Sequence, residues 1–176
     1  MTAHQSQPEA GQAPTEDSLN LGAVQIVDVV SSVVHDLDEL DQRVHLVMER
    51  APTVLADSEK LAEVTTSLLR SALASAPESG PIEVEVAARC LAQSHKTTKS
   101  GGEPQECRAL VSVAIRDYGT DVDQPTRPNH ETSPDLEAAF MSARKIVQLH
   151  KGTLWMRTRP EHGRTLGFCL SSEEVA

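Results

Sequence analysis

The side chains of this chain that could do covalent chemistry are its histidines. His35 is followed directly by Asp36, and a carboxylate beside an imidazole can orient the ring as a nucleophile. His35 falls inside a predicted helix, so a solvent-facing structural histidine is the favoured interpretation. Five other histidines show no spacing typical of metal ligands, namely His4, His45, His95, His130 and His162.

The three cysteines, Cys90, Cys107 and Cys169, form no CxxC pair. An odd number without that spacing favours reduced thiols over a disulfide framework or a zinc site. Cys90 and Cys107 flank a polar segment and could face each other across a hairpin. Whether these two can pair stays open.

Hydrophobic periodicity predicts the elements that position these residues. Valines and leucines recur at helical spacing from Leu21 to Leu40, and Asp57 is a good N-cap for a helix over 58–75. Alternating apolar residues predict a hairpin built from strands at 82–86 and 111–115. The remaining predicted elements are strands at 44–48, 54–55, 153–159 and 164–171, and a helix at 134–150 that Gly152 stops.

Polar segments separate or flank these elements. Residues 1–20 are rich in Gln, Glu, Pro, Ser and Thr and predict a disordered tail, because they cannot offset their ordering entropy. Residues 94–106 predict a mobile insertion within the hairpin, and residues 173–176 a short C-terminal tail. Removing the N-terminal tail or shortening the insertion is expected to leave the fold intact.

Composition narrows the function classes. A chain of 176 residues with 39% hydrophobic residues can bury one core, which must be aliphatic because aromatic residues make up only 2%. The formal charge of -10 disfavours nucleic acid as a partner and suits a basic protein surface. The absence of a signal peptide or a long apolar run predicts a cytoplasmic location and no membrane contact.

Three segments resemble the ATP-binding catalytic domain of sensor histidine kinases, the GHKL or Bergerat type. They are VLADSEKLAEVTTSLLRSALASAPESG, then AIRDYGTDV, and then KIVQLHKG with the strands that follow it. The third is similar to the family's "LHGG" turn, which makes His150 a structural residue at a helix end. The resemblance covers about residues 21–172 and implies a two-layer α/β sandwich, a mixed sheet with three helices on one face.

The resemblance also implies a residual nucleotide pocket. Asp117 stands where the family's aspartate accepts the adenine amino hydrogen, and Gly119 where a glycine lets the base approach the backbone. Thr165 occupies the place of a threonine that hydrogen-bonds near that aspartate. In an empty pocket, Asp117 and Thr165 would remain as a buried hydrogen-bonded pair.

The family's phosphate and metal groups are replaced. Ser67 and Ser71 stand at two asparagine positions that serve magnesium and phosphate in the family, and a serine hydroxyl is a weaker ligand at that reach. Asp121 replaces a glycine and would repel phosphates. Glu137-Ala138-Ala139-Phe140 replaces the glycines that let phosphates approach a helix N-terminus.

These departures predict a degenerate, non-catalytic domain that binds a sensor kinase, response regulator or similar protein and regulates signalling, with no cofactor. One alternative is a stand-alone kinase, of histidine-kinase or anti-sigma serine-kinase type, that uses ATP and magnesium. Another is a sensor of a nucleobase-bearing ligand without triphosphate. The expected partner surface is the 21–40 helix with its acidic residues, or the mouth of the pocket. The acidic residues are Asp36, Asp38, Glu39 and Asp41.

Overall fold

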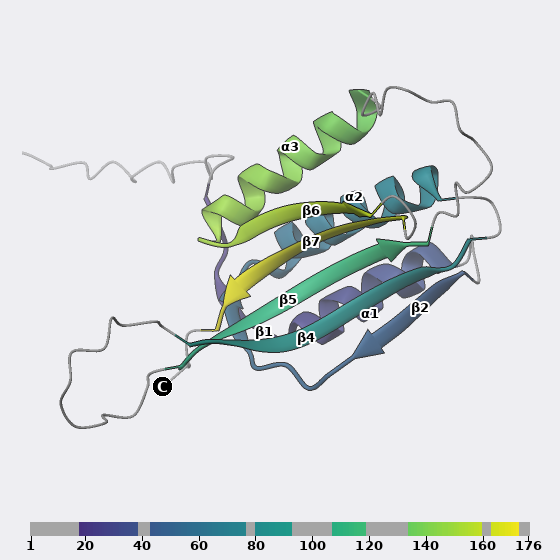
Figure 1. The fold of residues 1–176 in the computed structure, drawn as a ribbon. Helices are drawn as coiled ribbons and strands as arrows, with labels where there is room; N and C mark the ends of the chain where they lie inside the picture. Colours follow the sequence, from purple (N-terminus) through teal and green to yellow (C-terminus); the bar gives the residue numbers. More distant parts are fainter. Residues whose placement is uncertain are drawn as a thin grey trace, which may run out of the picture.

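The computed structural model describes residues 18–38, 43–76, 80–92, 107–118, 134–159 and 163–172. Within these residues a five-stranded mixed sheet in the order β2-β4-β5-β7-β6 is covered on one face by three helices (Figure 1). β2 runs parallel to β4, and every other neighbouring pair is antiparallel. The strands are β2 (Val44–Met48), β4 (Ile82–Ala92), β5 (Cys107–Asp117), β6 (Thr153–Arg159) and β7 (Gly163–Ser171). This is the two-layer α/β architecture that the sequence predicted.

The three helices are α1 (Ile26–Asp38), α2 (Ser58–Ser75) and α3 (Pro134–Leu149). Their apolar stripes form one core with the buried strand residues. Leu68 of α2, Val147 of α3 and Phe168 of β7 belong to this core and are each at most 1% exposed. Among the described residues, the buried core is aliphatic apart from Phe168, as the composition predicted. None of the described helices is long and apolar enough to cross a membrane.

The predicted helix at Leu21 to Leu40 is wrong at its start. Gly22–Val24 forms β1, which pairs antiparallel with β3 (Val54–Ala56), and the helix begins only at Ile26. The helical spacing of the valines continues into β1, but pairing with a distant strand overrides the local pattern. The C-terminal end of the predicted helix, at 39–40, lies outside the described residues.

The predicted β4–β5 hairpin is confirmed and is longer than expected. Its register pairs Cys90 with Ala109 and Cys107 with Ala92, so the two cysteines are two positions apart and do not face each other. Diagonal neighbours lie farther apart than the usual Cα separation of a disulfide. The predicted insertion at 94–106, most of the N-terminal tail and the C-terminal tail lie outside the described residues.

The C-terminal end of α3 depends on two neighbouring residues with different roles. Lys151 takes the left-handed conformation, with φ 55°, and the N–H of Gly152 donates to the carbonyl of Val147 at 2.9 Å. A Cβ at Gly152 would lie 2.6 Å from the carbonyl oxygen of Cys169. The helix therefore ends through the left-handed conformation of Lys151, and not of Gly152 as predicted. Glycine is needed at position 152 because the backbone there lies close to β7.

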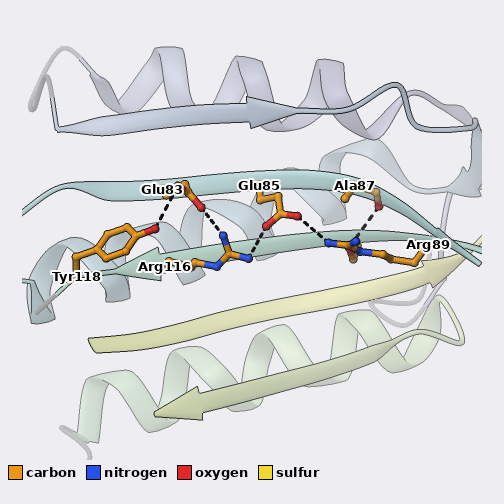
Figure 2. A network of polar contacts seen from close by, with 7 residues as sticks. Glu83, Glu85, Ala87, Arg89, Arg116 and Tyr118 are labelled. Carbon is orange, nitrogen blue, oxygen red and sulfur yellow. Dashed lines mark hydrogen bonds and ion pairs between the residues drawn. The ribbon is translucent and has the colours of Figure 1, made fainter. Parts of the chain in front are cut away.

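A polar network crosses the sheet face that the helices leave open (Figure 2). Arg116 of β5 bridges Glu83 and Glu85 of β4, and Arg89 donates to Glu85 at 2.8 Å. Tyr118 donates to Glu83 at 3.2 Å. Burial would lower the pKa of Arg116, but the two carboxylates outweigh it and raise the pKa. The network joins β4 to the end of β5 through Arg116, the residue before Asp117.

Candidate functional site

Asp117 ends β5 on the helix-covered face of the sheet. It lies opposite Ile82 of β4 and shares its face with Val113 and Ile115, because alternate strand residues point the same way. Asp117 is only 5% exposed. A carboxylate at this depth must find hydrogen-bond donors or an opposite charge within the protein.

Arg164, near the start of β7, supplies both. Its backbone N–H donates to Asp117 Oδ1 at 2.6 Å, and its Nε lies 3.5 Å from Asp117 Oδ2. The side chains of Arg164 and Asp117 are 15% and 6% exposed. Arg164 Nε is buried and makes no hydrogen bond, so its contact with the carboxylate is an ion pair.

The guanidinium of Arg164 also reaches the last turns of α2. Its Nη2 donates to the carbonyl of Ser71 at 3.2 Å and to the hydroxyl of Ser75 at 2.6 Å. Arg164 therefore bridges the end of β5 and α2, and its side chain lies directly beside the Asp117 carboxylate.

The predicted pairing of Asp117 with Thr165 is wrong. Thr165 lies opposite Arg116 of β5 and Arg157 of β6 in the strand register. Arg116 points to the open face of the sheet, where Figure 2 shows it between two glutamates. Because directly opposite strand residues share a face, the Thr165 side chain lies on the face away from Asp117. The residue beside Asp117 is instead Arg164, which directly precedes Thr165 in the chain.

Ser67 and Ser71 lie one turn apart on α2 and are both half-buried. The hydroxyl of Ser71 donates to the carbonyl of Ser67 at 2.9 Å, and that of Ser75 to the carbonyl of Ser71 at 2.8 Å. These hydroxyls use their hydrogens on the helix backbone, a common arrangement for serine in helices. Gly119 and Asp121 lie outside the described residues.

The first turns of α3 contain residues 137–140, which the sequence resemblance aligns with the family's glycines. Glu137 and Ala138 are exposed, whereas Phe140 is half-buried and packs against the hydrophobic core. His35, on α1, is exposed as predicted. In the part of the chain that the structure describes, no cluster of histidine, cysteine and acidic residues could hold a metal ion.

The start of α2 is attached to the end of α3 through His150. The backbone N–H of Asp57 donates to His150 Nε2 at 3.0 Å, and His150 Nδ1 donates to the carbonyl of Ile146 at 2.8 Å. The Asp57 carboxylate caps α2 by accepting from Lys60 N and also accepts from Asn20 N. Burial would raise the pKa of Asp57, but these backbone hydrogen bonds outweigh it and lower the pKa.

Arg164 is the site residue that sequence reasoning missed, and a signal for it was present. Leu166, Phe168 and Leu170 are buried at alternate positions of β7. The same alternation places position 164 on the helix-covered face, where a charge requires a partner. The preserved Asp117 is the opposite charge that this position meets.

Comparisons with known proteins agree with this architecture. No family model matches the chain. It is 28% identical over 134 residues to the adaptive-response sensory kinase SasA of Synechocystis sp., and 25% identical over 129 residues to that of Microcystis aeruginosa. Each match covers 68% of this chain but only 29% of the relative.

Solved structures extend the likeness to nearly the whole fold. The catalytic domain of histidine kinase ThkA matches with a TM-score of 0.60 at 16% identity, covering 88% of this chain and 98% of that one. The ATP-binding domain of PrrB from Mycobacterium tuberculosis matches with a TM-score of 0.56 at 17% identity, covering 88% and 99%. The cytoplasmic segment of QseC matches with a TM-score of 0.61 at 13% identity, covering 88% and 80%. The chain therefore has the GHKL, or Bergerat-type, fold of histidine-kinase ATP-binding domains, as its sequence resemblance implied.

Proposed function

We propose that this domain is a non-catalytic relative of histidine-kinase ATP-binding domains that regulates a signalling protein by binding it. The single observation that carries the proposal is the Asp117–Arg164 pair. In the family that the sequence resembles, the aspartate at this position accepts the adenine amino group. Here the carboxylate already accepts the Arg164 N–H and lies against the Arg164 guanidinium. The side chain of Arg164 also occupies space between Asp117 and α2 that a purine would need.

The surroundings of the pair support the same proposal. The Ser71 hydroxyl donates back to its own helix, and Phe140 fills space against the core where the family has phosphate-facing glycines. ATP and magnesium therefore fit poorly among the residues present. The arrangement also argues against a nucleobase sensor, because such a sensor would use the Asp117 carboxylate.

Calorimetric titration of Mg-ATP into the 176-residue chain tests the first half of the proposal. We expect no saturable binding at micromolar concentrations and no release of phosphate. Micromolar affinity accompanied by turnover would overturn the proposal and establish the kinase alternative.

Variants of Asp117 and Arg164 test whether this pair is the reason that nucleotide does not bind. If Arg164 fills the adenine space, Arg164→Ala should raise the affinity for adenine nucleotides about tenfold or more. Adding Asp117→Asn should remove that gain, because Asp117 would be the group that recognises adenine. Thr165→Ala is the matched control, since its side chain lies on the other face of the sheet, and should leave nucleotide affinity at the wild-type level.

The second half of the proposal concerns the partner. The structural neighbours include histidine kinases, so a sensor kinase or response regulator is the proposed partner class. Co-purification from the source cell, with the wild-type chain as bait and an unfolded variant as control, should recover such a protein. Recovery of none would contradict the regulatory role.

A further inference from the structure

β2 is an edge strand of the sheet with exposed apolar side chains. Among the described residues, no strand pairs with the side of β2 that faces away from β4, and Figure 1 shows it at the free margin of the sheet. The last three residues of β2 are apolar yet exposed: Leu46 at 36%, Val47 at 45% and Met48 at 39%. The other edge strand, β6, carries Arg157 and Arg159. Natural edges usually contain charges, prolines or bulges that block further pairing, and β2 contains none of these between Val44 and Met48.

The outward backbone groups of β2 follow from its pairing with β4. The carbonyl of Arg43 accepts from Ile82 N, and the N–H of Glu49 donates to the carbonyl of Val86, each at 2.9 Å. The odd-numbered residues of β2 therefore use their backbone groups toward β4. Since these directions alternate along a strand, the N–H and C=O of Val44, Leu46 and Met48 point out of the sheet.

A second copy of β2 complements this edge when the two strands run antiparallel about Leu46. Leu46 then lies opposite Leu46 of the second copy, and Val44 lies opposite Met48. All of these residues have outward backbone groups, so each pair can exchange two hydrogen bonds. This register uses the whole strand on both copies.

The same register matches charges at both ends. Arg43, just before β2, lies opposite Glu49 of the second copy, and Glu49 lies opposite Arg43 of the second copy. These are non-hydrogen-bonded pairs, in which side chains approach most closely. If the two-fold axis passed through His45 instead of Leu46, Arg43 would lie opposite Val47 and both charge pairs would be lost.

We propose that the domain forms a symmetric homodimer through antiparallel pairing of β2 with β2 of a second copy, centred on Leu46. The pairing joins the two sheets into one continuous sheet. It covers Leu46, Val47 and Met48 on both copies. This inference goes beyond the proposed function and depends on no nucleotide or signalling partner.

A single strand pair is small compared with a standard interface, so we expect a dissociation constant of about 10 µM to 1 mM. Each copy carries a formal charge of -10. Long-range repulsion therefore opposes association, and screening by salt tightens the dimer. Sedimentation equilibrium of the 176-residue chain, up to about 1 mM and at about 0.15 M salt, measures the constant directly.

Charge exchange tests the register. Arg43→Glu alone places two glutamates opposite each other, and Glu49→Arg alone places two arginines together, so each should raise the dissociation constant about tenfold. The double variant Arg43→Glu/Glu49→Arg restores opposite charges and should return to within about threefold of wild type. Arg70→Glu on α2, at an exposed position away from β2, is the control with the same change of charge and should leave the constant near the wild-type value.

Leu46→Lys places a charge at the centre of the edge. Leu46 is exposed enough to tolerate lysine, so the fold should survive, as checked by circular dichroism, while the dimer is lost. A wild-type chain that stays monomeric up to about 1 mM overturns the proposal. A dimer that persists in Leu46→Lys, or single charge variants that the double variant does not rescue, would overturn it as well.

Discussion

At position 164, a strand that otherwise buries apolar side chains on this face turns an arginine toward the helices. The arginine is accommodated because Asp117 ends the neighbouring strand on the same face, and because the carbonyl of Ser71 and the hydroxyl of Ser75 accept from the guanidinium. Each partner depends on the other, since either charge alone would be buried without compensation. The same two residues therefore contribute to local stability and, in the proposed function, also block the adenine position.

Removing one member of this pair should be costly. Asp117→Ala leaves the Arg164 guanidinium largely buried without its carboxylate and should lower the free energy of unfolding by about 3 to 5 kcal/mol. The double variant Asp117→Ala/Arg164→Met should lose less, because no unpaired charge remains. Urea denaturation followed by the fluorescence of Trp155, the single tryptophan of the chain, measures both. A double variant less stable than Asp117→Ala would contradict the pairing.

Lys151, by contrast, is a residue whose Cβ lowers the free energy of unfolding. It holds φ 55° at the end of α3, where a Cβ is strained and glycine is not. Lys151→Gly should therefore raise the free energy of unfolding by about 0.5 to 1 kcal/mol. Lys151→Ala keeps the Cβ and should leave stability close to wild type in the same urea experiment. Equal effects of the two substitutions would show that the backbone conformation is not the cause.

At the scale of elements, the start of α2 and the end of α3 are fixed as a unit. Asp57 caps α2, and its own backbone N–H is held by His150, the residue after the last turn of α3. Asp57 also holds Asn20, ahead of β1. Hydrogen bonds thus join Asn20, Asp57 and His150, and they connect the start of α2 to the end of α3.

The capping carboxylate makes part of this stability dependent on pH. Because the folded-state pKa of Asp57 lies below its ordinary value of 3.8, the charged form stabilises the fold above about pH 3.8. That contribution is lost as the pH falls through the lower folded-state pKa. Asp57→Asn keeps the cap but not the charge, so it should cost about 0.5 to 1 kcal/mol at pH 7.

The difference between wild type and Asp57→Asn should shrink as the pH falls below 3.8 and then disappear. Urea denaturation at a series of pH values measures it. A difference that stays constant from neutral to strongly acidic pH would mean that the Asp57 charge contributes nothing to stability.

At the scale of the whole molecule, the fold has the layers of histidine-kinase ATP-binding domains. In the proposed function, the Asp117–Arg164 ion pair blocks the position that adenine would take. A ligand that binds only the folded protein raises its free energy of unfolding by RT ln(1 + [L]/Kd). A ligand present at 100 times its dissociation constant would add about 2.7 kcal/mol. We therefore expect Mg-ATP at about 1 mM to leave the melting temperature of this chain unchanged.

Differential scanning calorimetry with and without Mg-ATP checks this expectation. The Arg164→Ala variant, in which the proposed obstruction is removed, is the matched comparison and should show the larger shift. A wild-type melting temperature that rises by several degrees with Mg-ATP would contradict the proposed obstruction by Arg164.

The sequence alone was enough to determine the order of most elements and the fold. Local signals are strong where a helix has one buried stripe or a strand alternates, as in α2, β4 and β5, and the "LHGG"-like turn placed His150 at a helix end. The family resemblance placed Asp117 at the end of a strand, whereas the apolar alternation by itself predicted a strand only over 111–115. These features depend on residues near one another in the chain.

Tertiary structure alone decided what the chain places beside Asp117, and where α1 begins. Gly22–Val24 is a strand because β3, about thirty residues away, offers it hydrogen bonds. The alternation within β7 indicates that Arg164 rather than Thr165 faces the helices, but only the strand register brings position 164 level with Asp117. A shift of one residue reverses the face of every side chain, so no pattern within one segment could fix that contact without the register of its neighbour.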